Sequence, residues 1–250
     1  MRKFIVIGLL AIIGYHLATA FSAIPFGENR MGNITDESTV AAYYLNNTVP
    51  KTQVANVITA IVVNYRGFDT LGEVTVLFLA VTGLGSILFR RKEEGEVDRI
   101  QLSASPLINS GAKLLYPLIV LLGIYVFIHG HLTPGGGFQG GAIIATGFLL
   151  MMISYRDFKV SHGKLAWVES LAGITFVTLG FWGLFTGGTF LENFLPNGEL
   201  NSLISGGIIP IIYIAVGLKV AAELIGVLDT LLKIKPEKEK IINPTEQKAK

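Results

Sequence analysis

Long apolar runs separated by short polar segments make up most of the chain. Six runs are candidate membrane spans: residues 4–24, 71–89, 114–128, 142–154, 165–185 and 203–232. A hydrocarbon core of about 30 Å needs roughly 20 apolar helical residues. The pattern therefore predicts an all-α, polytopic membrane helix bundle with about six transmembrane helices. The third and fourth runs are short, and a glycine-rich segment at residues 129–141 joins them. Because irregular backbone is not tolerated in contact with lipid, we expect protein to bury this segment or the interface to hold it.

Residues 54–89 are too long for one span. As a single helix these 36 residues would extend about 54 Å at 1.5 Å per residue. The sequence NYRGFD at residues 64–69 interrupts them. We interpret residues 54–63 as a helix that lies along the interface or is partly re-entrant, followed by a true span from Leu71.

The distribution of lysine and arginine predicts that both termini are cytoplasmic, because cytoplasmic loops carry the excess of these residues. With the N-terminus inside, the inner segments hold Arg2, Lys3, Arg90, Arg91, Lys92, Arg99, Arg156, Lys159, Lys164 and the lysine-rich tail. The outer segments hold Arg30, Lys51 and Arg66. Residues 1–23 also resemble a signal peptide, with Ala18-Thr19-Ala20 after a basic start and an apolar run. We expect this segment to be retained as the first span.

Composition supports a membrane protein and narrows its chemistry. Hydrophobic residues make up 51% of the 250 residues and charged residues 15%, whereas a soluble protein has about 25% charged residues. Mean hydropathy is +0.57. The chain has no cysteine, which excludes disulfides, thiolate-bound zinc and cysteine-held iron–sulfur clusters within it. Any redox centre would therefore belong to a partner.

Asp69 and Glu73 form the first group of candidate functional residues. They are four residues apart, on one face of the helix expected to start around Thr70. Two carboxylates this close do not both stay ionised cheaply, so the pair is suited to hold a shared proton or a Na⁺ ion. Alternatively, Asp69 caps the helix and Glu73 is stabilised by the helix dipole. Spacing alone leaves both interpretations open.

Lys219 and Glu223 form a second pair, again four residues apart, inside the last predicted span. Ionisable groups within apolar spans are costly and are functional candidates by default. A buried lysine with a carboxylate beside it is a plausible proton carrier. The alternative is a local ion pair near the cytoplasmic face, with Lys219 extending towards water. Glu169 and His16 are lone polar residues that we expect to be hydrogen-bonded within the bundle.

The glycine-rich segment begins with His129-Gly130-His131. Two histidines on a turn make a poor metal site without further ligands, but His131 is a candidate for a proton path because histidine titrates near neutral pH. The motif that follows is Pro134, Gly135, Gly136, Gly137, Phe138, Gln139, Gly140, Gly141. Its Gly-x-x-x-Gly spacings favour close helix packing. It is not a phosphate loop, because no Gly-Lys-Ser/Thr follows.

This motif, between two hydrophobic helices, resembles the hallmark of the B-type subunit of Mrp-type multisubunit Na⁺/H⁺ antiporters, and the resemblance covers roughly residues 103–233. Residues 57–73 (VITAIVVNYRGFDTLGE) are similar to the C-terminal end of the large A-type Mrp subunit. The chain thus looks like a fusion of two neighbouring Mrp subunits. The domains implied are a two-span region at 1–100, a four-span domain like the B-type subunit at 101–233 and a polar cytoplasmic tail at 234–250.

The resemblance implies a multi-pass cell-membrane protein that acts as one subunit of a complex exchanging Na⁺ for H⁺. It implies no catalytic site and no cofactor in this chain, with Na⁺ and H⁺ as the transported ions. The implied partners are other Mrp-type subunits, the lipid bilayer and hydrogenase-like redox subunits, with no nucleic acid. Acidic residues matching Asp69 and Glu73 are implicated in the family's ion path. The fusion favours a respiratory complex, of the hydrogenase or sulfur-reducing type found in archaea, over a free-standing antiporter.

Two rival functions stay open at this point. A purely structural scaffold would join antiporter subunits while the ions move elsewhere, and the packing glycines suit it. A membrane enzyme with its own active site would need a nucleophile–base pair or a metal-ligand set, and the sequence offers neither.

Overall fold

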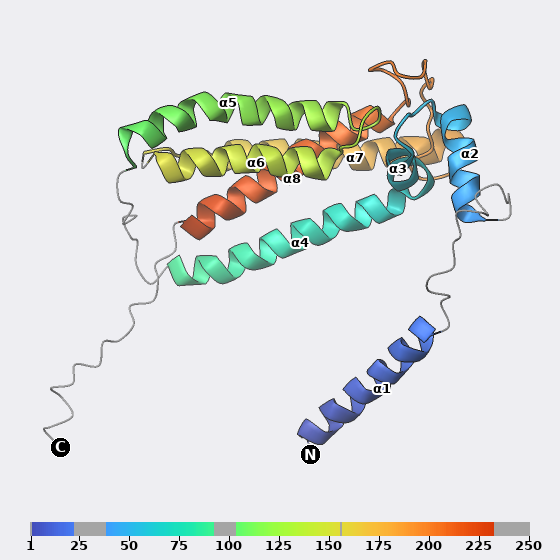
Figure 1. Ribbon diagram of the computed structural model, residues 1–250, viewed down its shortest axis with the longest axis horizontal. Helices are drawn as coiled ribbons and strands as arrows, with labels where there is room; N and C mark the ends of the chain where they lie inside the picture. The colour runs from blue at the N-terminus through green and yellow to red at the C-terminus, as the bar shows by residue number, and fades with distance from the viewer. Residues whose placement is uncertain (1, 23–38, 93–103, 156, 233–250) are drawn as a thin grey trace, which may run out of the picture. The chain divides into compact units, whose positions relative to one another are not determined.

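The computed structural model describes residues 2–22, 39–92, 104–155 and 157–232, and every regular element in these ranges is helical. The elements are α1 (Arg2–Ser22), α2 (Val40–Thr52), α3 (Val57–Ala60), the π-helix η2 (Ile61–Tyr65), α4 (Gly67–Lys92), α5 (Pro106–Ile128), α6 (Gly137–Ser154), α7 (His162–Gly187) and α8 (Ile209–Leu232). The predicted all-α class is therefore confirmed for the described residues (Figure 1).

The chain divides into two units, Met1–Tyr44 and Leu45–Lys250. The first holds α1, whose apolar stretch Val6–Thr19 carries exposed side chains throughout. The second holds a bundle of long helices. Five helices among the described residues are long and apolar enough to cross a membrane: Gly67–Ile87, Pro106–Ile128, Gly137–Ser154, His162–Gly187 and Ile209–Leu232. The described part of the second unit thus holds five candidate membrane spans, all of them helical.

Helix α5 starts earlier than predicted, at Pro106 rather than 114. Ser105 caps it by accepting a hydrogen bond from the Ile108 amide on its hydroxyl (3.3 Å), and proline suits the first helical position. Helix α6 likewise starts at Gly137 instead of 142, inside the glycine-rich segment. Both predicted spans are too short because apolar length alone assigns the polar and glycine residues at their starts to loops.

Helix α8 starts later than predicted, at Ile209 rather than 203. Gly206 (φ 88°) and Gly207 (φ 61°) take the left-handed backbone region, which glycine adopts at little cost and which cannot continue an α-helix. The side chain of Asn193 stabilises this turn by accepting a hydrogen bond from the Ile208 amide (3.1 Å). Residues 203–208 are therefore not part of helix α8, although the sequence around them is largely apolar.

Helix α8 is the core of the bundle. In its apolar stretch 61% of the residues are buried, against 17% for α5. It packs against α6, α7, α4 and α5, and Figure 1 shows it running between α4 and α6. One core cluster joins Ile212 and Val216 of α8 to Phe176 of α7 and Val74 of α4. Any polar group on α8 therefore has to find its partners inside protein.

Helix α4 does not continue from α3. The π-helix η2 ends at Tyr65, and Arg66 leaves helical geometry (φ −131°, ψ 43°) before α4 begins at Gly67. The Thr70 hydroxyl donates a hydrogen bond to the Val62 carbonyl (2.6 Å), so this backbone carbonyl has a partner despite the break in the helix. The predicted interruption is confirmed, and the span after it begins four residues before the predicted Leu71.

Candidate functional site

Lys219 lies at the centre of a buried charged group, the triad, which it forms with Glu169 and Glu223. Its Nζ atom is 2.7 Å from Oε1 of Glu223, one turn along α8, and 3.5 Å from Oε1 of Glu169 on α7. The side chain of Glu223 is 0% exposed, that of Lys219 11% and that of Glu169 25%. From α4, the ring of Phe78 lies over the ammonium group, 5.0 Å from its centroid. Three helices therefore enclose one ammonium and two carboxylates.

The position of the triad argues against a lysine that reaches water. Lys219 is ten residues from Ile209 and thirteen from Leu232, or about 15 and 20 Å along the helix. Its small exposed fraction fits this mid-span depth. Glu169 finds a partner within the bundle, as predicted, but it is not a lone polar residue, because it meets Lys219 of a second helix. Sequence spacing reveals the i, i+4 pair on α8 but not the third member on α7.

The charges of the triad do not balance. Two ionised carboxylates and one ammonium leave a net charge of −1 among apolar helices, which is costly in a low-dielectric environment. Glu223 has both oxygens buried, and Oε2 has no hydrogen-bond partner among the described residues. The short Lys219 contact at Oε1 is an ion pair with poor hydrogen-bond angles. This arrangement can accept one more positive charge at the free oxygen.

Asp69 and Glu73 have a different environment. Asp69 pairs with Arg66 (2.6 Å from Nε to Oδ2), and the two side chains are 51% and 60% exposed. Glu73 is also exposed, one turn further along α4. Asp69 stands in the first turn of the helix, where a negative charge is favoured by the helix dipole, and is not its cap. The structure thus keeps both carboxylates on the surface of this chain, and their predicted ion-path role stays a prediction.

The turn between α5 and α6 is anchored by α3. Asn56 donates from Nδ2 to the carbonyls of Gly130 (2.9 Å) and Thr133 (3.0 Å), and Thr59 donates to Gly130 (2.6 Å). The Tyr213 hydroxyl on α8 donates to Thr59 (2.9 Å). These bonds connect the segment before α4 with the glycine-rich segment and the core helix.

His131 is fully buried in this turn. Burial lowers the pKa of its imidazole below the ordinary value. Backbone groups at Ser202 and Leu203 lie close enough to oppose this shift, but neither ring nitrogen has a described partner in hydrogen-bond geometry. The ring is therefore held neutral near pH 7 and stands apart from the triad. Its predicted place in a proton path stays a prediction.

The glycines of the motif pack helices together. A Cβ atom on Gly140 would lie 2.6 Å from the Gly123 carbonyl oxygen of α5, and one on Gly141 would lie 2.7 Å from the Gly217 carbonyl oxygen of α8. Phe138 is partly buried against the core. Helix α6 thus fits between its neighbours only because these positions lack side chains.

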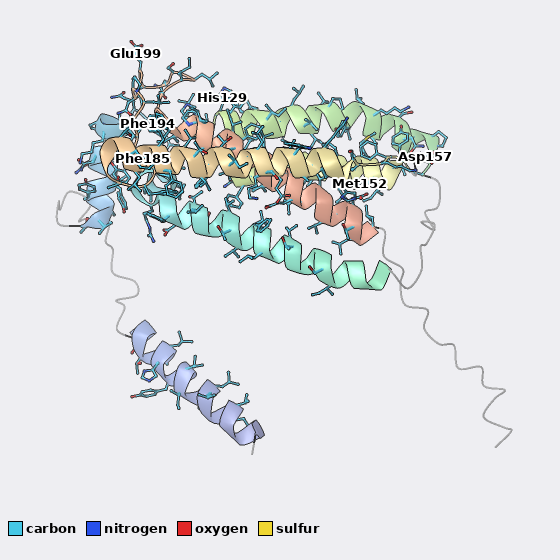
Figure 2. All side chains as sticks on the ribbon, turned by 180° about the vertical axis from the view of Figure 1, so that it is seen from behind. His129, Met152, Asp157, Phe185, Phe194 and Glu199 are labelled. Atoms are coloured by element: carbon cyan, nitrogen blue, oxygen red, sulfur yellow. The ribbon has the colours of Figure 1, made fainter. Side chains whose placement is uncertain are left out.

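A second buried carboxylate lies near the end of α8, at a position for which the sequence predicts no role. Asp229 is 0% exposed, and its Oδ2 is 2.8 Å from Nε2 of His162 at the start of α7. Asp229 falls inside the predicted last span, so the rule that selected Lys219 also applied to it. Figure 2 marks the two ends of the bundle, with Glu199 and Phe185 at one and Asp157 at the other. The His162–Asp229 pair lies at the Asp157 end, where α7 begins.

Two family models match the chain. Residues 107–226 match the domain related to the MnhB subunit of Na⁺/H⁺ antiporters. Residues 6–101 match the MbhE family, which is described as the E-type subunit of MBH.

Known proteins resemble the chain over different extents. It is 34% identical over 235 residues to an uncharacterized protein of Methanocaldococcus jannaschii, covering 83% of this chain and 88% of that protein. It is 29% identical over 153 residues to the A/B-type subunit of a probable K⁺/H⁺ antiporter of Rhizobium meliloti, covering 52% of this chain but 14% of that protein.

Two solved structures share the fold. A chain of the membrane-bound sulfane sulfur reductase, an archaeal respiratory membrane complex, is 42% identical with a TM-score of 0.74, covering 94% of this chain and 99% of that one. A chain of the Mrp complex from Dietzia sp. is 26% identical with a TM-score of 0.68, covering 95% of this chain and 26% of that one.

Proposed function

Since the chain belongs to the family of MnhB-related membrane subunits of Na⁺/H⁺ antiporters, we propose that it serves the Mrp-type antiporter module of a larger respiratory complex. Its near-complete match to a chain of the archaeal sulfane sulfur reductase supports this assignment over a free-standing antiporter. The chain has no cysteine, so redox centres would belong to its partners. In this proposal it carries no catalytic site or cofactor of its own, and the complex moves Na⁺ and H⁺.

The observation that carries the proposal is the triad of Glu169, Lys219 and Glu223. Charged side chains in the middle of a span are expensive to keep, and here three of them meet across two helices. We assign them the main role in moving charge through this subunit. Asp69 and Glu73 occupy an exposed surface of α4 that a neighbouring subunit would cover, so they are suited to pass ions between subunits.

The proposed topology has six spans and both termini in the cytoplasm. Helix α1 is 21 residues long and would supply the sixth span. The lysine and arginine distribution supports the orientation. The end of the bundle where His162 and Asp229 pair would then face the cytoplasm, because Lys159 and Lys164 flank the start of α7.

The experiment purifies the native complex through a tag on this chain and measures Na⁺/H⁺ exchange in proteoliposomes. We expect antiporter and redox subunits to co-purify. Lys219→Met should abolish exchange while the complex stays intact, whereas the exposed Glu199→Gln in the α7–α8 loop should leave exchange unchanged.

A scaffold subunit is the rival function, and the close packing of Gly140 and Gly141 favours it. It predicts full exchange in the intact Lys219→Met complex. Recovery of the chain alone, as a stable protein without partners, would contradict both functions.

A further inference from the structure

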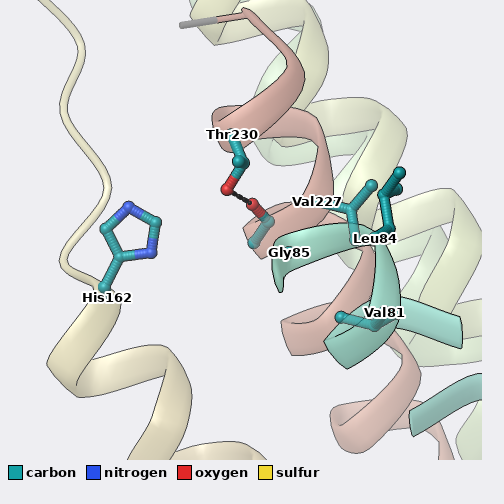
Figure 3. Close-up of a pocket in the computed structure, with 7 residues that line it drawn as sticks. Val81, Leu84, Gly85, His162, Val227 and Thr230 are labelled. Atoms are coloured by element: carbon teal, nitrogen blue, oxygen red, sulfur yellow. Dashed lines mark hydrogen bonds between the residues drawn. The ribbon is translucent and has the colours of Figure 1, made fainter. Parts of the chain in front are cut away.

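A pocket of about 180 Å³ lies between α4, α7 and α8 at the end of the bundle where α7 begins (Figure 3). Val81 and Gly85 line it from α4, Gly226 and Thr230 line it from α8, and His162 lies on the α7 side. The Thr230 hydroxyl donates to the Gly226 carbonyl (2.8 Å). The two glycines keep the facing helices from filling this space with side chains.

On each of the three helices, the pocket residues follow the triad towards the same end. On α4, Val81 comes three residues after Phe78, and on α8, Gly226 comes three residues after Glu223, a rise of about 4.5 Å in both cases. Helix α7 runs the other way, and His162 precedes Glu169 by seven residues, or about 10.5 Å. The pocket therefore lies about one helical turn beyond the triad, on the side of the His162 end of the bundle.

We propose that this pocket is the vestibule through which a single proton enters and leaves the triad, with His162 as the group at its mouth. The inference rests on the proposed function and adds the ion that the triad binds and the side from which the ion arrives. A proton would pass from the His162 imidazolium, through water in the pocket, to a carboxylate oxygen of the triad. The imidazole would then take up a proton from bulk water, so that charge and atoms balance.

His162 is suited to the mouth because its side chain is 57% exposed while its Nε2 contacts the buried Asp229 carboxylate. An imidazole ring can both accept and donate a proton through its two nitrogens. The contact with Asp229 keeps this water-exposed imidazole at the edge of the pocket.

Proton binding fits the triad better than Na⁺ binding. One added proton balances the −1 charge of the ionised triad and occupies the Glu223 oxygen that has no partner. Hard metal cations prefer several oxygen ligands, and here the ammonium of Lys219 already lies 2.7 Å from the same carboxylate. A sodium ion would meet that positive charge directly.

Few other charges face the triad. Helix α6 carries no ionisable side chain, and α4 carries none within one turn of Phe78; Glu73 lies five residues away. On α5, Lys113 lies over the Tyr155 ring, 5.2 Å from its centroid. On α7, the exposed Lys164 lies five residues before Glu169. On α8, Asp229 pairs with His162. The protonation of the triad is therefore set mainly by its own three members and by the pocket.

Thiol labelling tests the vestibule, because the chain has no cysteine of its own. In the purified complex, Val81→Cys and Val227→Cys should react with a small cationic methanethiosulfonate at least about tenfold faster than Leu171→Cys on the outward face of α7, because only hydrated thiols ionise. Equal rates at all three positions would overturn the vestibule.

Carbodiimide labelling tests the ion, because dicyclohexylcarbodiimide attacks protonated carboxyl groups in apolar surroundings. Mass spectrometry of this chain should locate the label on Glu223 or Glu169, and labelling should fall as pH rises. Na⁺ at constant ionic strength should not protect these carboxyl groups from the label. Protection by Na⁺ would show that the triad binds a metal cation and not a proton. Absence of label at every pH would show that no carboxyl group of the triad is protonated.

Both labels are read without transport. A wild-type complex that labels as expected but exchanges no Na⁺ for H⁺ would therefore contradict the proposed function but not the proton-binding site.

His162→Gln should slow proton exchange, displacing the pH profile of transport while leaving the assembled complex intact. An unchanged pH profile would show that His162 is not the group that passes protons into the pocket.

Discussion

His131 stands in the turn between α5 and α6, fully buried and close to the backbone at Ser202. Burial lowers the pKa of its ring in the folded protein, whereas the unfolded chain keeps the ordinary value of 6.5. A lowered pKa means that the folded state binds a proton less readily than the unfolded state. The stabilising effect of the neutral ring is therefore complete above pH 6.5 and is lost as pH falls through the folded pKa.

The pH dependence is measurable in the segment that faces the ring. Lowering the pH of the purified complex from 7.5 to about 5 should speed hydrogen exchange at residues 202–205, because placing a charge on the buried imidazole is costly. His131→Asn removes the titrating group and should flatten this dependence. Exchange that is equally pH-sensitive in both proteins, after correction for intrinsic rates, would show that another group is responsible.

Helix α6 depends on the absence of side chains along two of its faces. Gly141→Ala would place a methyl group 2.7 Å from the Gly217 carbonyl oxygen, against backbone that has no rotamer to change. Overpacking of this kind costs about 1–3 kcal/mol. We expect the complex to have a lower midpoint of thermal unfolding. Size-exclusion chromatography of samples heated to increasing temperatures measures this midpoint.

Gly173→Ala is the matched control, because a Cβ at that position on α7 meets nothing within 4 Å. It should leave the midpoint unchanged or raise it slightly, since alanine favours helix more than glycine does. If both variants lowered the midpoint equally, loss of helix packing at Gly141 would not be the cause.

At the scale of elements, periodicity and apolar length predict most of the helices but not all of their ends. Pro106 and Ser105 carried a start signal that apolar length alone overlooks. The start of α8 depends on two left-handed glycines, which are visible only in the backbone. Pairing along one helix, as for Lys219 and Glu223, follows from i, i+4 spacing. Contacts between helices do not follow from spacing, so the sequence does not place Glu169 beside Lys219.

At the scale of the whole molecule, non-covalent contacts join the segment around α3 and α4 to the glycine-rich turn and α8, which lie far away in the sequence. Asn56 and Thr59 bond the turn that precedes α6, and Val63 and Val74 belong to the same core cluster as Ile209 of α8. The family matches change between residues 101 and 107, so the peptide link falls between two regions that contact each other directly.

A chain cut between residues 96 and 97 should therefore still assemble. Co-expressed as two pieces, the N-terminal part should co-purify with a tagged C-terminal part, because the contacts of α3 and α4 with the glycine-rich turn and α8 all survive the cut. Asn56→Ala combined with Thr59→Val removes three hydrogen bonds to that turn, each worth about 0.5–1.5 kcal/mol. Recovery of the N-terminal piece should then fall several-fold, while the same two substitutions in the uncut chain, where the pieces cannot separate, should reduce its yield far less. Failure of the unsubstituted pieces to co-purify would mean that the peptide link, and not these contacts, keeps the two regions together.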